Sequence, residues 1–374
     1  MKLMENKRIL CICNTPLQLL NMINVISSDY QNEKRDLLIT DEIRNCEILI
    51  ENIRKSNFFE NVYLVNEDYK TTVFLQKNLL CKIYELNKYR KRLKAQYDTK
   101  KIYDRIFFGG KNWLNNFVAK QIRKNKKCEF AWIDEGTASY STHGLFWKKN
   151  WFQKVLFRLN PNQLLKELFG INYLINKVNF QYLYRPEIAD YEVPFPRKQI
   201  SLLNSNSDNA LLFKQIFGCT ENNFIKEKYI YFDGAGDADG LYGNDKELLA
   251  LVAECVGKEN LLVKVHPRSS IEYYIQNGYH INTNLSIPWE IYCLEPEQLN
   301  NKVLISIFST AIVSPYIYFG LKNKVISLIH LYDKSFYNDY YKYLLDFIER
   351  KIFLAHKDIY MLPNTFEELK KYLT

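Results

Sequence analysis

The sequence predicts an α/β protein built from two Rossmann-like domains, and three observations carry this prediction. Short apolar runs alternate with helical patterns along most of the chain, which is typical of strands connected by helices. Many of these runs are apolar at consecutive positions, as expected for parallel strands that are covered on both faces. The 374 residues, of which 47% are hydrophobic and 25% charged, are enough for two hydrophobic cores.

The alternation of strand and helix patterns occurs in each half of the chain. In the first half we expect strands at residues 8–13, 36–39, 62–65, 105–108 and 128–133. The helical patterns there lie at residues 16–26, 42–55 and 72–95. In the second half we expect strands at residues 229–232, 261–265, 303–308 and 324–329. The helical patterns there lie at residues 246–256, 310–319 and 334–349.

A less regular stretch separates the two halves. It contains Pro194, Pro196 and a polar cluster at residues 204–209, which is typical of a connection between domains. We therefore predict three segments, in which the connection is flanked by an N-terminal and a C-terminal Rossmann-like domain: residues 1–190, 191–228 and 229–374.

The charge balance and the cysteines narrow the class of protein. Lys and Arg number 51 against 42 Asp and Glu, and the net charge of +9 suggests an anionic partner. No nucleic-acid-binding motif accompanies this charge, so we expect no nucleic-acid partner. None of the eight cysteines forms a C-x-x-C pair, which excludes a zinc framework of the usual spacing. Buried thiols of this kind indicate a reducing compartment, and we expect a cytoplasmic protein.

Two segments bear on membrane contact. Residues 303–321 carry no charge, but several serines and Pro315 interrupt them, so we expect a buried strand and a helix there rather than a membrane span. Residues 145–177 mix aromatic and basic side chains, with Glu167 as the one acid. This mixture suits peripheral contact with the anionic inner face of the cytoplasmic membrane. It suits equally well a helix packed on the first domain with its basic face in solvent.

Polar motifs follow several of the expected strands, where doubly wound sheets bind their ligands. The first motif, Asp134-Glu135-Gly136, comes directly after the strand at 128–133. A close pair of carboxylates can raise the pKa of one of them enough for it to act as a general base. The same residues are also typical of a helix N-cap followed by an acid in the first turn.

The second motif is a glycine-containing loop after the strand at 229–232. Gly234, Ala235 and Gly236 allow the backbone to approach a ligand phosphate closely, and Asp237 follows them. A flexible Gly/Asp turn would have the same composition.

The third motif lies at the end of the strand at 261–265. It consists of Lys264, His266, Pro267 and Arg268. A protonated His can donate a hydrogen bond or a proton to a departing phosphate, and the flanking cations stabilise its negative charge. Pro267 ends the strand and fixes the direction of the turn. The motif therefore predicts a site for an anionic leaving group.

The fourth motif, Ser309-Thr310, lies between an expected strand and an expected helix. Hydroxyl groups and free backbone N–H groups at a helix N-terminus suit a phosphate, and they also suit simple N-capping. Glu290 opens a short helix between the third and fourth motifs. It is a candidate acceptor of hydrogen bonds from ribose hydroxyls, the alternative being a surface acid.

The ordered set of these motifs resembles the three motifs shared by bacterial sialyltransferases and polysialyltransferases. The set is Asp134-Glu135-Gly136, His266-Pro267 and Ser309-Thr310. The opening at residues 11–18, which includes Thr15 and Gln18, resembles the start of the lipooligosaccharide sialyltransferase family, glycosyltransferase family fifty-two. The resemblance implies the GT-B fold, in which two Rossmann-like lobes face a central cleft.

The resemblance also implies the reaction and the partners. It implies an inverting transfer of sialic acid from CMP-sialic acid to a terminal sugar, such as galactose, of a lipooligosaccharide or capsular glycan. No metal or other cofactor is expected, and a homodimer is implied. A CMP leaving group carries one phosphate, so it can depart without a metal ion, whereas a nucleoside diphosphate more often recruits one.

The resemblance assigns roles to single residues. His266 would assist the CMP phosphate, Ser309 and Thr310 would bind it, and Glu290 would hold the ribose. The base is either Asp134 or Asp237, although the loop after Asp237 is longer than the family pattern. Lys264, Arg268 and the glycine loop are then expected on the donor side. Thr15, Gln18, Glu135 and Gly136 are expected on the acceptor side.

Three alternatives remain open at this point. An enzyme of the same fold could use another nucleotide sugar, such as a UDP-sugar. Asp237-Ala238-Asp239 could be the D-x-D motif of metal-dependent glycosyltransferases with a single sheet. A two-domain protein could also bind nucleotides or glycans without turning them over.

Overall fold

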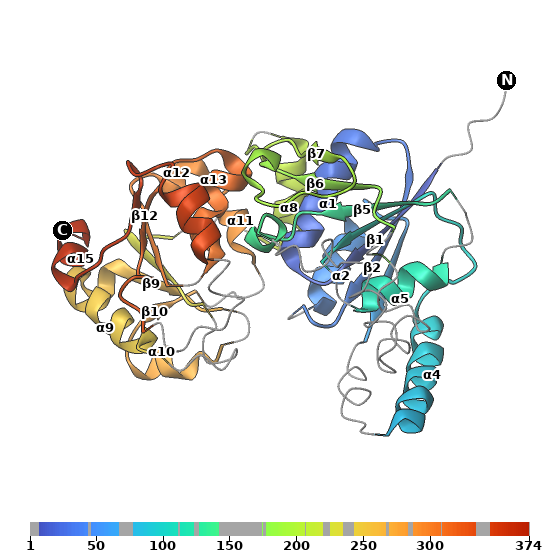
Figure 1. Cartoon of the computed structure of the whole chain (residues 1–374), viewed down its shortest axis with the longest axis horizontal. Helices are drawn as coiled ribbons and strands as arrows, with labels where there is room; N and C mark the ends of the chain where they lie inside the picture. Colours follow the sequence, from blue (N-terminus) through green and yellow to red (C-terminus); the bar gives the residue numbers. More distant parts are fainter. Residues whose placement is uncertain are drawn as a thin grey trace, which may run out of the picture. The chain divides into compact units, whose positions relative to one another are not determined.

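The computed structural model in Figure 1 describes most of the chain, and its contacts divide into two compact units. It describes residues 7–43, 46–66, 78–110, 113–122, 127–141, 174, 177–205, 207–219, 225–234, 243–266, 269–282, 287–307, 309–333 and 345–373. The first unit comprises residues 1–135 and 142–201, and the second comprises residues 136–141 and 202–374.

The first unit is a seven-stranded parallel sheet flanked by helices (Figure 1). The strands are β1 (Arg8–Cys13), β2 (Lys34–Thr40), β3 (Asn61–Val65), β4 (Arg105–Gly109), β5 (Glu129–Ile133), β6 (Phe180–Leu183) and β7 (Arg197–Gln199). Their order across the sheet is β3-β2-β1-β4-β5-β6-β7. The helices between them include α1 (Pro16–Asp29), α2 (Cys46–Lys55), α4 (Leu79–Gln96) and α5 (Trp113–Ile122).

Helix α1 begins where the sequence supplies both a cap and a preset backbone angle. The Thr15 side chain accepts a hydrogen bond from the N–H of Gln18, and Pro16 occupies the first helical position, where its missing N–H costs nothing. Residues 18–26 of the helix are buried, including polar Gln18, Asn21 and Asn24. Because burying these amides without partners would be costly, their hydrogen bonds matter for the site described below.

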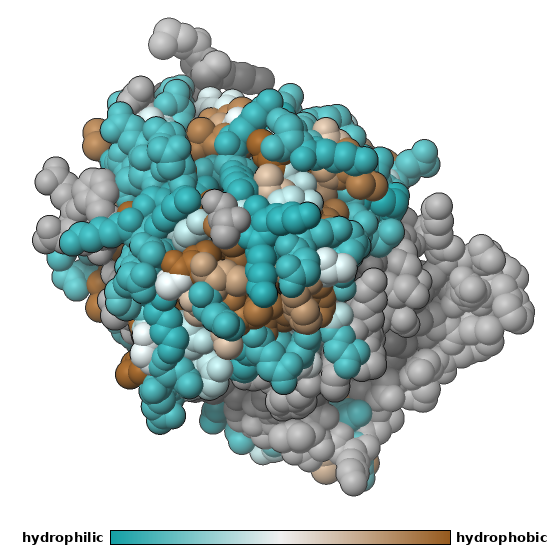
Figure 2. Space-filling model, turned by 90° about the vertical axis from the view of Figure 1, so that its left-hand side faces the viewer, coloured by the Kyte–Doolittle hydropathy of each residue, from teal (hydrophilic) through white to brown (hydrophobic). Residues whose placement is uncertain are grey.

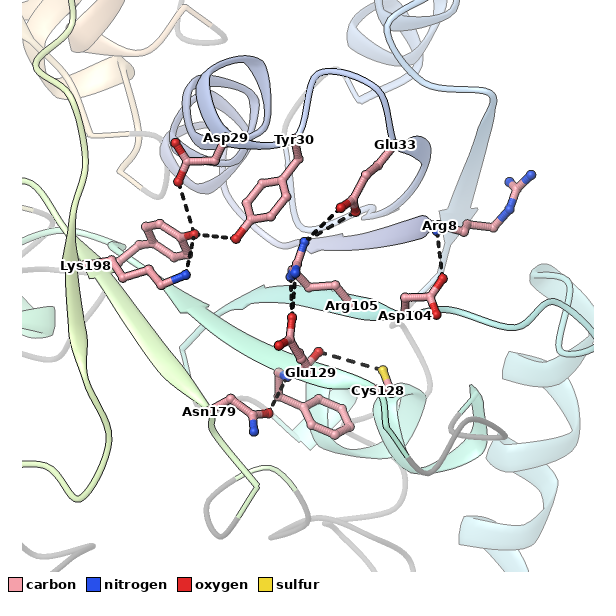
Figure 3. Close-up of polar contacts among 12 residues, drawn as sticks. Arg8, Asp29, Tyr30, Glu33, Asp104, Arg105, Cys128, Glu129, Asn179 and Lys198 are labelled. Atoms are coloured by element: carbon pink, nitrogen blue, oxygen red, sulfur yellow. Dashed lines mark hydrogen bonds and ion pairs between the residues drawn. The ribbon is translucent and has the colours of Figure 1, made fainter. Parts of the chain in front are cut away.

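Ion pairs and hydrogen bonds connect side chains at the amino-terminal edge of the first sheet (Figure 3). The Arg105 guanidinium lies 2.5 Å from a Glu129 carboxylate oxygen and 3.3 Å from Glu33, and it stacks 4.0 Å from the centre of the Tyr30 ring. The Tyr30 hydroxyl lies 2.6 Å from that of Tyr182. The Arg105 cation therefore has an acid on each of two neighbouring segments beside it.

The second unit is a six-stranded parallel sheet. Its strands are β8 (Tyr229–Phe232), β9 (Leu261–Lys264), β10 (His280–Ile281), β11 (Val303–Ser306), β12 (Lys324–Ser327) and β13 (Tyr360–Met361), in the order β10-β9-β8-β11-β12-β13. Its helices include α8 (Asp208–Phe217), α9 (Asp245–Val256), α10 (Glu272–Gln276), α11 (Trp289–Tyr292), α12 (Pro296–Leu299), α13 (Ser314–Phe319) and α15 (Phe366–Leu373).

Both sheets reverse their strand order at one point, between β1 and β4 in the first unit and between β8 and β11 in the second. A ligand of a doubly wound sheet binds beyond the carboxyl ends of the two strands at this switch point. Apolar side chains of the strands and helices form a core in each unit, around Phe108 and Trp132 in the first and around Ile305 and Val252 in the second. The prediction of two Rossmann-like α/β units is confirmed.

The uncharged stretch at 303–321 belongs to the core of the second unit. It contains β11, a 3₁₀ helix at Thr310–Val313 and α13, as a buried strand and helix pattern predicts. Within the described ranges, no helix combines the length and the apolar character that crossing a membrane requires. Figure 2 shows the side of the molecule at which Figure 1 labels α15, where hydrophilic residues surround a group of apolar ones.

The stretch predicted as an irregular connection contains regular structure. Within residues 191–228 the chain forms β7, the edge strand of the first sheet, and α8, which belongs to the second unit. The change from one unit to the other falls after Ser201. One earlier segment, residues 136–141, also belongs to the second unit, where the buried Tyr140 ring stacks 6.5 Å from that of Phe347.

Candidate functional site

The first cluster of candidate residues lies at the carboxyl edge of the first sheet, beside the switch point. Gln18, in the first turn of α1, donates from its side-chain amide to a Glu135 carboxylate oxygen at 3.3 Å. Its Oε1 accepts the backbone N–H of Asn14 at 2.8 Å. Gln18 therefore connects the end of β1 to the residue pair that follows β5.

Two glycines at the end of β4 leave room for these side chains. A Cβ at Gly109 would collide with the Gln18 side chain, and a Cβ at Gly110 would collide with the Glu135 carboxylate. Gly110 also has a φ of +63°, which favours glycine. Asn115 on α5 holds this turn, since its side-chain amide donates to the carbonyl oxygen of Gly109.

The two adjacent acids at the end of β5 have different environments. Asp134 is fully buried, its backbone N–H donates to the carbonyl of Tyr182, and its carbonyl accepts from the Asn21 side chain at 2.9 Å. Glu135 is partly exposed and lies beside Gln18. A general base must reach the proton that it abstracts. The geometry therefore favours Glu135 over Asp134 as the acid that meets a substrate.

The backbone conformation at position 136 explains why this motif ends in glycine. Its φ of 115° and ψ of −169° lie in a region that is essentially restricted to glycine, and a 3₁₀ helix at Thr137–Ser139 follows it. The sharp turn follows Glu135, two residues after the end of β5, and there the chain enters the second unit.

Sequence reasoning missed three asparagines that belong to this cluster. Asn21 accepts a hydrogen bond from the Tyr184 hydroxyl at 3.0 Å, and Asn24 donates to that hydroxyl at 3.2 Å. Asn14 is buried, and among the described residues neither polar atom of its side chain has a hydrogen-bond partner. Polar residues three apart on one buried face, as at 18, 21 and 24, are the pattern that indicates such a network.

A substitution at Gly110 tests the packing around Glu135. We expect Gly110→Ala to lower the free energy of unfolding by about 1 kcal/mol more than Gly278→Ala does, because the Glu135 carboxylate must move aside and lose its hydrogen bond with Gln18. Gly278 is a matched control, because its φ is +69° and a Cβ there would enter open space. The measurement is urea unfolding of both variants, and equal losses would contradict the close approach of Glu135.

The second cluster lies at the carboxyl edge of the second sheet, where β8, β9 and β11 end. Phe232, Lys264 and Ser306 occupy one row of neighbouring positions across these strands. The Phe232 ring packs edge-on against Trp289 at 4.8 Å, and so holds α11 close to this row. Glu290, the next residue of α11, is buried there.

The backbone of His266 is held by the residue that follows β8. The His266 N–H donates to a carboxylate oxygen of Asp233 at 3.2 Å, and the Asp233 N–H donates to the carbonyl of Lys264 at 3.1 Å. Asp233 is buried. Burial raises the pKa of the neighbouring Tyr274 hydroxyl, and the charge of Asp233 raises it further. Lys246 donates to that hydroxyl at 3.1 Å. His266 itself is partly exposed.

Lys264 and Glu290 are a buried pair of opposite charges. Burial lowers the pKa of Lys264 to about 8, against the effect of Glu290, which raises it. Burial also raises the pKa of Glu290, against a hydrogen bond from the Ser314 hydroxyl at 2.8 Å and the charge of Lys264. Desolvation is the largest cause in both cases, so neither charge is fully compensated by the other. An anion bound beside Lys264 would favour the charged form of this lysine.

Ser309 and Thr310 follow β11 and are partly exposed. The Ser309 N–H donates to the Ser306 hydroxyl at 2.9 Å, and the Ser309 hydroxyl accepts from the N–H of Ala311 at 3.3 Å. Ser309 therefore caps the 3₁₀ helix, as the simpler interpretation predicts, and its hydroxyl proton stays available to a ligand.

The remaining predicted site residues are placed as follows. Thr15 is exposed at the start of α1, and Gly234 is partly exposed directly after Asp233. Outside the described residues lie Ala235, Gly236, Asp237, Pro267 and Arg268, as well as nearly all of the segment 145–177. Of the two candidate bases, only Asp134 is therefore among the described residues.

Comparisons with known proteins show the fold. No family model matches the chain. No curated protein matches it either.

Solved structures do resemble it over nearly its whole length. An α/β-galactoside α-2,3-sialyltransferase from Photobacterium phosphoreum is 14% identical, with a TM-score of 0.53, and the match covers 96% of this chain and 99% of that one. A UDP-GlcNAc 2-epimerase from Methanocaldococcus jannaschii is 11% identical with a TM-score of 0.51, covering 98% and 91%. TcCGT1, solved with UDP, is 9% identical with a TM-score of 0.52, covering 98% and 90%. The chain thus has the two parallel α/β units of the GT-B glycosyltransferase fold.

Proposed function

We propose that the chain is a glycosyltransferase that uses a nucleotide-activated sugar, with sialic acid carried on CMP as the donor. The observation that carries this proposal is the cluster at the carboxyl edge of the second sheet. There Lys264, His266, Glu290 and Ser309 combine a buried cation, a protonatable ring, a carboxylate and a hydroxyl. The likeness to a Photobacterium sialyltransferase supports this choice of donor.

Each of these residues has a proposed task toward the donor. The hydroxyls of Ser309 and Thr310 donate to the CMP phosphate, and Lys264 supplies a positive charge in a site of low polarity. Glu290, with one oxygen fixed by Ser314, accepts hydrogen bonds from the ribose hydroxyls. When the bond between the anomeric carbon and the phosphate oxygen breaks, His266 donates a proton to the departing phosphate.

Glu135 is the proposed base. In a single displacement the acceptor hydroxyl attacks the anomeric carbon as CMP leaves, and the configuration at that carbon inverts. The hydroxyl proton passes to the Glu135 carboxylate, and Gln18 orients that carboxylate by donating to it. No step of this reaction requires a metal ion, because His266, Lys264 and the hydroxyls carry the charge of a single phosphate. The acceptor is a terminal sugar, such as galactose, on a lipooligosaccharide or capsular glycan.

A second donor class is favoured by one observation. Among the structures that resemble the chain, TcCGT1 was solved with UDP, at a TM-score close to that of the sialyltransferase. A UDP-sugar would use the same cluster of residues. Contact with an anionic membrane through residues 145–177 and homodimer formation both stay predictions.

Release of CMP from CMP-sialic acid tests the proposed function. We expect a galactose-terminated acceptor to stimulate release in the presence of EDTA. We expect His266→Ala to lower the stimulated rate about 10²–10⁴-fold, as the loss of a general acid does. His280→Ala is the matched control, since that histidine is exposed on the same unit.

Three other results have separate meanings. No release with several acceptors would refute the sialic acid donor, and UDP release from UDP-sugars would then support the second class. Binding of CMP without any turnover would indicate a binding protein. Release that EDTA abolishes would contradict a metal-independent reaction.

A further inference from the structure

A cavity of about 530 Å³ lies in the second unit, away from the residues discussed above. It is lined by the first residues of β8, β11 and β12, by the end of α12 and by the last turn of α15. Because all strands of this sheet are parallel, these strand starts form the edge opposite to that of His266 and Ser309. The two edges are separated by the length of a four-residue strand, roughly 13 Å.

The lining of this cavity is positively charged. Four lysines contribute to it, namely Lys228, Lys302, Lys322 and Lys324. Asn300, Asn301 and Asn323 add side-chain amides, and the described lining residues include no acid. We call this cavity the lysine pocket. The corresponding edge of the first sheet is different, because Arg105 there lies between Glu33 and Glu129 (Figure 3).

Two of the four lysines have a structural task. The Lys302 ammonium donates to the carbonyl oxygens of residues 225, 226 and 227, at 2.9, 3.1 and 2.7 Å, and uses all three of its protons. The Lys324 ammonium donates to the carbonyl oxygen of Tyr372 at 2.6 Å, at the end of α15. Lys324 thus satisfies a carbonyl group in the last turn of α15 that has no partner within the helix, and Lys302 holds the irregular segment before β8.

The other two lysines have no such task. Lys228 and Lys322 are exposed, and neither forms an ion pair or a side-chain hydrogen bond in the part of the chain that the structure describes. The Lys228 ammonium lies 5.0 Å from the centre of the Tyr229 ring. Burial lowers the pKa of Lys324, and the positive charge of Lys228 lowers it further. The pocket therefore holds more positive charge than its own chain neutralises.

We propose that the lysine pocket binds a phosphate ester. The ammonium groups of Lys228 and Lys322 can share one phosphate, and the side-chain amide of Asn300 suits the hydroxyls of an attached sugar or glycerol. Its volume falls in the range of pockets that hold small molecules. A soluble phosphorylated metabolite and the headgroup of an anionic phospholipid share this chemistry. Because the pocket lies on the edge opposite to His266, the proposal does not depend on the donor or on the reaction.

The test compares binding of glycerol 3-phosphate with binding to vesicles made of equal parts phosphatidylglycerol and phosphatidylcholine. The probe variant is the double substitution Lys228→Gln with Lys322→Gln in the full chain. The matched control is Lys351→Gln with Lys357→Gln, which removes the same charge from exposed positions of the same unit. We expect the probe variant to weaken binding about tenfold or more and the control to leave it unchanged.

The two arms identify the source of the phosphate ester. Loss of glycerol 3-phosphate binding in the probe variant indicates a soluble ligand, and loss of vesicle binding alone indicates a lipid headgroup. The probe variant should unfold at the same temperature as the wild type, because neither lysine holds the fold. Absence of binding by the wild type in both arms would overturn the proposal. So would equal losses in probe and control, or a fall in Tm confined to the probe variant.

Discussion

Glu135→Gln should lower the rate of sugar transfer about 10²–10⁴-fold, the range that the loss of a positioned general base produces. The amide keeps the shape of the side chain and its contact with Gln18, but it cannot take up the proton of the acceptor hydroxyl. Binding of CMP should be unchanged, because the proposed donor residues all belong to the second unit. The measurement is acceptor-stimulated CMP release, together with a separate titration of CMP.

Asp134→Asn is the informative comparison for this prediction. Since Asp134 is fully buried, its replacement should lower the free energy of unfolding and leave transfer by the folded protein within about tenfold of wild type. The opposite pattern, with transfer retained by Glu135→Gln and lost in a folded Asp134→Asn, would make Asp134 the base. Transfer at the wild-type rate in both variants would leave Asp237 as the candidate base.

Lys264→Met should weaken CMP binding about 10–100-fold, because it removes a charged hydrogen-bond donor from a buried site. The same change should alter the pH dependence of stability. The pKa of Lys264 is about 8 in the folded chain against an ordinary value of 10.5. The unfolded chain therefore binds more protons between these values, and wild-type stability should rise with pH from about 8 to about 10.5. The full difference corresponds to about 3 kcal/mol.

Unfolding of wild type and Lys264→Met at a series of pH values measures this effect. Below pH 8 the cost of burying the ammonium is fully present in the wild type, and above about 10.5 it has disappeared. The variant should lack this rise. Lys357→Met, at an exposed position, should show the wild-type profile. If the free energy of unfolding depended on pH in the same way in wild type and Lys264→Met, the Lys264 ammonium would be solvated in the folded protein.

Apolar runs predicted the central strands of both sheets because those strands are buried on both faces, as β1 and β11 are. The same signal found the edge strand β3, but it missed the edge strands β7, β10 and β13, and also β6, which lies next to β7. β7 consists of Arg197, Lys198 and Gln199, with no apolar residue, and it exists because β6 offers it a free edge. Such a strand depends on its neighbour rather than on its own sequence.

The sequence also indicated part of the candidate site and left another part open. The rule that ligands bind beyond strand ends led to the acids after β5, to His266 and to Ser309. It could not decide between Asp134 and Glu135, because neighbouring residues of an extended chain point to opposite sides. Which side faces solvent is set by the contacts of Asn21 and Tyr182 with the Asp134 backbone, and these come from α1 and β6.

The six residues after Glu135 give the chain an interleaved domain structure. Residues 136–141 belong to the second unit, although residues 142–201 return to the first. A truncated protein that starts at residue 202 would lack Tyr140 and would leave the Phe347 ring without its stacking partner. The second unit is therefore not a separable module of this polypeptide. Recombination or engineering that exchanges the first unit must keep residues 136–141 with the second.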